Sequence, residues 1–163
     1  MQVAKTHLAG LLILGLSLLG QEKAAADVVK ARAAIGRGDF PAAFKEFKES
    51  AEKGDPLAQA AVGVMLHIGT GVKRDLKQAF SWYRKAAEQG YAAGQANVGI
   101  MYSKGAGTEQ NDVQAYAWLD LASHTRGGRE HNAKQHVAKY LTKAQLREAE
   151  KLAAQYRKKY LKK

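Results

Sequence analysis

The stretch from Ala79 to Gln114, AFSWYRKAAEQGYAAGQANVGIMYSKGAGTEQNDVQ, decides the fold of this 163-residue chain. Its first part has the apolar spacing of an amphipathic helix, carried by Ala79, Phe80, Tyr83 and Ala87. Gly90 follows where a helix commonly ends in a left-handed turn, which glycine adopts without steric cost. A second helical pattern then runs to Gly105-Ala106-Gly107, which breaks it. The stretch therefore predicts one helix–turn–helix unit.

The unit recurs with a period of 36 residues. Residues 43–78 and 79–114 are identical at thirteen of 36 aligned positions, and a partial copy follows at 115–125. A fixed period of this length is typical of a solenoid, because one repeat cannot bury its own apolar face. The glycines that we interpret as structural recur in both full copies: Gly54, Gly63, Gly69, Gly71, Gly90, Gly99, Gly105 and Gly107.

The segments AFSWYRKAAEQG and NVGIMYSKGAGT resemble the Sel-one-like repeat (SLR), a relative of the tetratricopeptide repeat (TPR). The resemblance covers roughly residues 42–123. It implies an all-α fold, a short TPR-like α/α superhelix of about eight helices with helical caps. It further implies a non-enzymatic scaffold for protein–protein interaction in the bacterial envelope. The chain departs from the family pattern at Glu46, where later copies have tryptophan, and at Gly94, where the family usually has alanine.

Residues 1–26 have the pattern of a secretory signal peptide. Lys5 precedes an apolar run over residues 8–20, and Ala24-x-Ala26 offers a cleavage site. The alternative is a membrane anchor, but the run is shorter than the roughly 20 residues needed to span a bilayer. We expect cleavage and a periplasmic or secreted protein, which folds without disulfides because the chain contains no cysteine.

Helical caps are expected on both sides of the repeats. Residues 27–42 predict an N-terminal capping helix with Val28, Ala31 and Ile35 on one side. Residues 126–163 predict a basic C-terminal cap that completes the core, because two repeats and a fragment are few for a solenoid. This cap has a break at Gly127-Gly128, a helix over 130–140 and a final helix opened by a capping box at Thr142 and Gln145. The first of these helices places three apolar residues on one face, Ala133, Val137 and Tyr140.

The charge is concentrated in the C-terminal cap. Residues 27–125 contain twelve basic and eleven acidic residues, whereas residues 126–163 contain twelve and three. Lys143, Arg147 and Lys151 share one face of the final helix. This asymmetry indicates an anionic partner, such as lipid headgroups or acidic polysaccharide. The alternative is a solvated outer face with a basic tail. Export argues against nucleic acid as the partner.

Trp82 and Trp118 occupy equivalent positions of successive copies and have two interpretations. They either fill the core against the small residues of neighbouring helices, or they anchor a partner protein or peptide in a recognition groove, where aromatic side chains are common. The sequence leaves both open.

No motif in the sequence predicts catalysis. The glycine pairs follow helices rather than strands, so they are repeat turns and not phosphate-binding loops. His131 and His136 are five residues apart, whereas two metal ligands on one helical face need a spacing of four. We therefore expect no enzyme, no catalytic residue, no metal and no cofactor. The identity of the partner, the pathway and the oligomeric state do not follow from the sequence.

Overall fold

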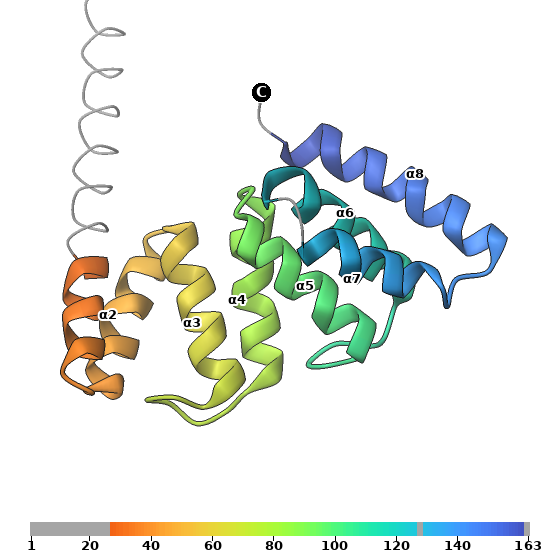
Figure 1. The fold of residues 1–163 in the computed structure, drawn as a ribbon. Coiled ribbons are helices and arrows are strands. Elements are labelled where there is room, and N and C mark those ends of the chain that lie inside the picture. The colour runs from red at the N-terminus through yellow and green to blue at the C-terminus, as the bar shows by residue number, and fades with distance from the viewer. Residues whose placement is uncertain (1–26, 127–128, 162–163) are drawn as a thin grey trace, which may run out of the picture.

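The computed structural model describes residues 27–126 and 129–161, and all regular secondary structure in these ranges is α-helical. A helix over residues 27–36 precedes seven more in the described residues; α2 to α6 stack side by side in chain order, and both α7 and α8 pack on α6 (Figure 1). This confirms the expected all-α repeat fold with helical caps. The seven helices are α2 (Phe40–Glu52), α3 (Pro56–Ile68), α4 (Leu76–Glu88), α5 (Ala92–Lys104), α6 (Asp112–Arg126), α7 (Arg129–Ala138) and α8 (Lys143–Tyr160).

Two expectations lie outside the described residues, namely the signal peptide at 1–26 and the break at Gly127-Gly128. Within the described residues, no helix combines the length and the apolar character that a bilayer span requires.

The 36-residue period determines where helices start. Asp39, Asp75 and Asn111 precede α2, α4 and α6, and each side chain accepts a hydrogen bond from the backbone N–H three residues on, at 2.9–3.1 Å. These contacts satisfy N–H groups that a helix leaves without partners at its first turn. The predicted start at Asp55-Pro56 is present, with the carboxylate 2.7 Å from Ala58 N. The capping box at Thr142 and Gln145 is also present.

Glycine permits close approach between helices at several points. At Gly63, a Cβ would lie 2.7 Å from the Tyr83 ring, and at Gly99 it would lie 2.7 Å from Leu119. The other six repeat glycines have positive φ, including Gly90 at +85°, where the left-handed turn was predicted. Larger residues at these positions would push the helices apart or strain the turns.

Two side chains predicted to face inward are exposed. Ile35 is 43% exposed, and Ala34 is buried instead with Val28 and Ala31, because the helix over 27–36 buries residues at a spacing of three. Tyr140 is 68% exposed, because α7 ends at Ala138 and the chain turns before Tyr140 can join its buried face.

The C-terminal helices cover the last repeat. Val137 of α7 packs in a cluster with Ala115 and Leu119 of α6. α8 lies along α6 at the end of the stack farthest from α2 (Figure 1), and it buries Ala149 and Ala153. The non-repeating C-terminus therefore supplies the packing that a third full repeat would otherwise provide.

Candidate interaction grooves

Trp118 lies in the core beneath α8. It is 2% exposed, and its ring packs against two tyrosines of α8, with centroid distances of 4.7 Å to Tyr156 and 5.5 Å to Tyr160. A residue so buried offers no surface to a partner protein. The structure thus favours the core interpretation for Trp118 over the groove interpretation.

Polar contacts surround this aromatic cluster. The Tyr156 hydroxyl donates a hydrogen bond to Gln114 Oε1 at 2.7 Å. Burial raises the pKa of this hydroxyl, with Tyr102 and Tyr160 adding to the effect. The Tyr156 side chain therefore occupies a defined site on α6, with Gln114 as its polar partner and Trp118 and Tyr160 as aromatic neighbours.

Asp120 fastens both C-terminal helices to α6. Its side chain is nearly buried, and it accepts hydrogen bonds from Lys134 of α7, at 2.9 Å, and from Arg157 of α8. This carboxylate pairs with two cations that would otherwise be unpaired in partly desolvated surroundings. The sequence reasoning did not identify Asp120, because nothing near it in the sequence indicates its partners.

Trp82 has a different environment, although it is the equivalent residue one repeat earlier. It is half-buried and lines an open groove of about 340 Å³ between α2 and α4. Lys85 Nζ lies 4.0 Å from the Trp82 ring centroid, a cation–π contact. Phe44 and Lys48 of α2, Gln78 of α4 and Leu66 of α3 contribute to the same groove.

The groove at Trp82 is cationic. Lys48, Lys73 and Arg74 line it against one carboxylate, Asp75. Both oxygens of Asp75 already accept hydrogen bonds from Gln78, from the backbone N–H at 2.9 Å and from the side-chain amide at 2.8 Å. The backbone hydrogen bond is the main reason why the pKa of Asp75 lies below its ordinary value. The groove therefore presents an apolar floor with positive charge at its edge.

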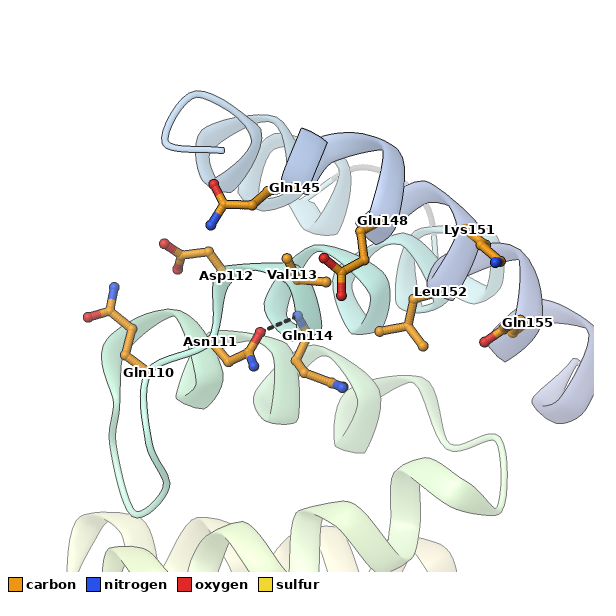
Figure 2. A pocket seen from close by; sticks show the side chains of 10 residues that line it. All are labelled: Gln110, Asn111, Asp112, Val113, Gln114, Gln145, Glu148, Lys151, Leu152 and Gln155. Carbon is orange, nitrogen blue, oxygen red and sulfur yellow. Dashed lines mark hydrogen bonds between the residues drawn. The ribbon is translucent and has the colours of Figure 1, made fainter. Parts of the chain in front are cut away.

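A second, larger cleft of about 740 Å³ lies between α8 and the start of α6 (Figure 2). Side chains from the two segments line the space between them, and one lysine, Lys151, is set against two carboxylates, Asp112 and Glu148. Because negative charges outnumber positive charges in its lining, the cleft does not favour binding of an anion. Most of the remaining polar lining consists of carboxamides, from Gln110, Asn111, Gln114, Gln145 and Gln155.

Lys143, Arg147 and Lys151 are exposed on α8, and none has an ion pair within the described part of the chain. The structure therefore separates the five predicted partner-binding residues. Trp82 lines the groove between α2 and α4, Trp118 lies in the core, and the three cations lie on the far helix. We did not predict Phe44, Lys48 and Gln78 as groove residues, although the repeat period places Gln78 and Trp82 on the same helix one turn apart.

Within the described residues, no group of three histidine, aspartate or glutamate side chains is arranged to hold a metal ion. His124 has its Nδ1 2.8 Å from the Asp120 backbone oxygen on its own helix.

The family model for the Sel1 repeat matches residues 56–91 and 92–124. The chain carries two tandem Sel1 repeats. The matched Sel1 repeats pair α3 with α4 and α5 with α6, so they begin one helix later than the copies at 43–78 and 79–114, which pair α2 with α3 and α4 with α5. Sel1 repeats typically serve as protein–protein interaction scaffolds. No curated protein sequence matches the chain.

Two solved structures share this Sel1-repeat architecture. One is a protective antigen present in uropathogenic Escherichia coli strains that displays an SLR fold, with 38% identity and a TM-score of 0.81 over 86% of this chain. The other is a Sel1 repeat protein from Oxalobacter formigenes, with 28% identity and a TM-score of 0.65 over 70% of this chain. This chain spans 31% of the first protein and 49% of the second.

Proposed function

We propose that this chain is a non-enzymatic scaffold of the bacterial envelope that binds a protein or peptide partner in the groove between α2 and α4. The observation that carries the proposal is the half-buried Trp82 in an open groove. The equivalent Trp118 is covered by α8. A large aromatic side chain in a partly desolvated groove is the usual anchor of a binding hot spot.

Site-specific photo-crosslinking tests this proposal. A photo-reactive amino acid replaces Lys48 at the edge of the groove, and a second variant carries it at Ile68, which is 67% exposed on α3 and does not line the groove. We expect a discrete protein adduct from the Lys48 position and none from Ile68. Equal adducts from both positions, or no adduct from Lys48, would contradict the proposal.

We propose a second function for α8, the binding of anionic lipid headgroups or acidic polysaccharide. It is supported by the three exposed cations on one face, Lys143, Arg147 and Lys151, which have no ion pair in the described residues. Attraction of this kind is screened over about 8 Å at physiological salt. Vesicles with anionic lipids should therefore bind the protein at low salt and release it at high salt. Replacing all three cations by alanine should abolish the binding. Unchanged binding would mean that this face of α8 is solvated and binds no anionic ligand.

We also propose that the protein is exported after cleavage before Asp27. The support is the sequence pattern of residues 1–26, with its short apolar run and its Ala24-x-Ala26 site. The intact mass of protein recovered from the periplasm or the medium tests this. We expect the mass of residues 27–163, whereas a full-length chain retained in the membrane would contradict the proposal.

A further inference from the structure

The empty groove at Trp82 and the site of Tyr156 are related by the repeat. A shift of 36 residues carries Gln78 onto Gln114 and Trp82 onto Trp118, which are the two residues that hold Tyr156. The same shift carries the other walls of the groove, Phe44, Lys48 and Leu66, onto Phe80, Arg84 and Tyr102.

Two of these three equivalent residues, Arg84 and Tyr102, lie near Tyr156, and the third, Phe80, lies against Tyr102. Tyr102 and Arg84 both lie close enough to change the pKa of the Tyr156 hydroxyl, and the Phe80 ring packs edge-on against Tyr102 at 5.1 Å. The groove between α2 and α4 therefore repeats the site of Tyr156 on α6. In the later site a tyrosine from α8 is bound, and in the earlier site the described residues leave an open volume of about 340 Å³.

The charges of the two sites differ. Lys73, Arg74 and Asp75 at the edge of the earlier groove correspond to Glu109, Gln110 and Asn111 in the later one. Lys48 adds a further positive charge, only loosely paired with Glu52 at 3.9 Å. An occupant of the earlier groove thus meets a surplus of positive charge, and its own charge should be negative.

We infer that the groove between α2 and α4 binds a tyrosine-bearing, acidic segment of a partner protein. This rests on the proposed scaffold function and specifies the chemistry of the partner. The tyrosine ring would pack against Trp82 as Tyr156 packs against Trp118, with its hydroxyl directed to the Gln78 amide. Carboxylates beside it would face Lys48 and Lys73.

A second copy of this chain fits the groove poorly. Three cations, Arg157, Lys158 and Lys159, lie between its two tyrosines at the end of α8, and Lys48, Lys73 and Arg74 would repel them. The charge of the groove therefore selects against the chain's own C-terminal helix.

A designed peptide tests the inference directly. It copies residues 149–161 with the four cations Lys151, Arg157, Lys158 and Lys159 replaced by glutamate, and carries a fluorescent label. We expect it to bind the protein, and we expect the same peptide with Tyr156→Ala to bind at least about tenfold more weakly, since a packed aromatic anchor carries much of such an interface. The native basic peptide is the charge control and should bind more weakly than the acidic one.

Protein variants locate the site. Trp82→Ala should weaken binding of the acidic peptide by about tenfold or more, as expected for a hot-spot residue. Ile68→Ala, which removes an exposed apolar side chain outside the groove, should leave it unchanged. The double variant Lys48→Gln/Lys73→Gln replaces only exposed side chains, so it should fold, and it should weaken binding most at low salt.

Several outcomes would overturn the inference. They are no binding of the acidic peptide at millimolar concentration, equal affinity for Trp82→Ala, or tighter binding of the basic peptide, which would indicate a second copy as the occupant. A crosslinked partner at Lys48 together with no binding of the acidic peptide would retain the scaffold function and reject only the tyrosine-and-acid chemistry.

Discussion

The Tyr156 ring packs against Trp118, with 4.7 Å between the ring centroids, although the two residues belong to helices separated by α7 in the chain. The contact covers the apolar surface of the last repeat, because Trp118 would otherwise be exposed to solvent. It is also the contact from which we infer the chemistry of the open groove. Both the stability of the fold and the chemistry of the open groove follow from this relationship.

Removal of residues 142–163 should prevent cooperative folding of the remainder. Without α8, Trp118 and the apolar face of α6 lose their cover, and repeat arrays depend on such terminal caps. A thermal melt followed by tryptophan fluorescence measures this, and we expect no cooperative transition and a red-shifted emission. As a mild control, Tyr156→Phe removes only the hydrogen bond to Gln114 and should cost about 1 kcal/mol. A cooperative melt at unchanged temperature after truncation would show α8 to be dispensable.

Asp120→Ala should destabilise the protein by about 2 kcal/mol or more, because it leaves Lys134 and Arg157 without their carboxylate in partly buried surroundings. Glu88→Ala is the matched control. Its carboxylate pairs with Arg84 at 3.0 Å, but both side chains are largely exposed, so the cost should stay below about 1 kcal/mol. Urea unfolding of the two variants gives the comparison, and equal midpoints would mean that Asp120 does not fasten α7 and α8.

Gly94→Ala should destabilise the fold even though alanine favours helix over glycine by about 1 kcal/mol. A Cβ at this position would lie 2.8 Å from the backbone nitrogen of Ala87 and 2.9 Å from the Tyr83 oxygen, so α4 and α5 would have to separate. Overpacking of this kind costs about 1–3 kcal/mol.

Gly36→Ala is the control for this substitution. It lies at the end of the helix over 27–36, where a Cβ would meet nothing within 4 Å, so the change should be neutral or slightly stabilising. Melting temperatures of the two variants decide the matter. A Gly94→Ala protein as stable as Gly36→Ala would mean that the two helices do not approach so closely.

Stability should fall at alkaline pH through Tyr83. Burial raises the pKa of the Tyr83 hydroxyl from 10.0 to about 12, so the folded protein retains the proton that the unfolded chain releases. The stabilisation is complete below pH 10 and is lost as the pH rises from 10 towards 12, with a slope of up to about 1.4 kcal/mol per pH unit. Denaturant melts across this range should show the decline.

Tyr83→Phe should reduce the slope of that decline without abolishing it, since burial is also the main cause of the raised pKa values of Tyr116 and Tyr156. An identical slope in the variant would show that the Tyr83 hydroxyl ionises as readily in the folded protein as in the unfolded chain.

The sequence predicted those features that follow from local patterns. The 36-residue period, the caps at Asp55 and Thr142 and the left-handed turn at Gly90 depend on neighbours a few residues away. The departure at Gly94 was visible too, but its reason, the approach of Ala87 from another helix, was not.

Long-range packing could not be predicted. Trp82 and Trp118 have equivalent positions in the repeat, and only the path of α8 decides that one is covered and the other half-exposed. Ile35 has the spacing of a core residue, yet the helix over 27–36 meets its neighbour through Ala34. The burial of these side chains depends on how separate helices pack together. The periodicity of the sequence does not determine that packing.

The two tryptophan side chains report directly on whether the groove at Trp82 receives a tyrosine as Trp118 receives Tyr156. The chain has two tryptophans, so a ¹H–¹⁵N spectrum should show two indole signals, assigned with Trp82→Phe. We predict that titration with the acidic tyrosine peptide shifts the Trp82 indole signal and leaves that of Trp118 unchanged. A shift at Trp118 alone, or no shift at Trp82 under saturating peptide, would contradict the account.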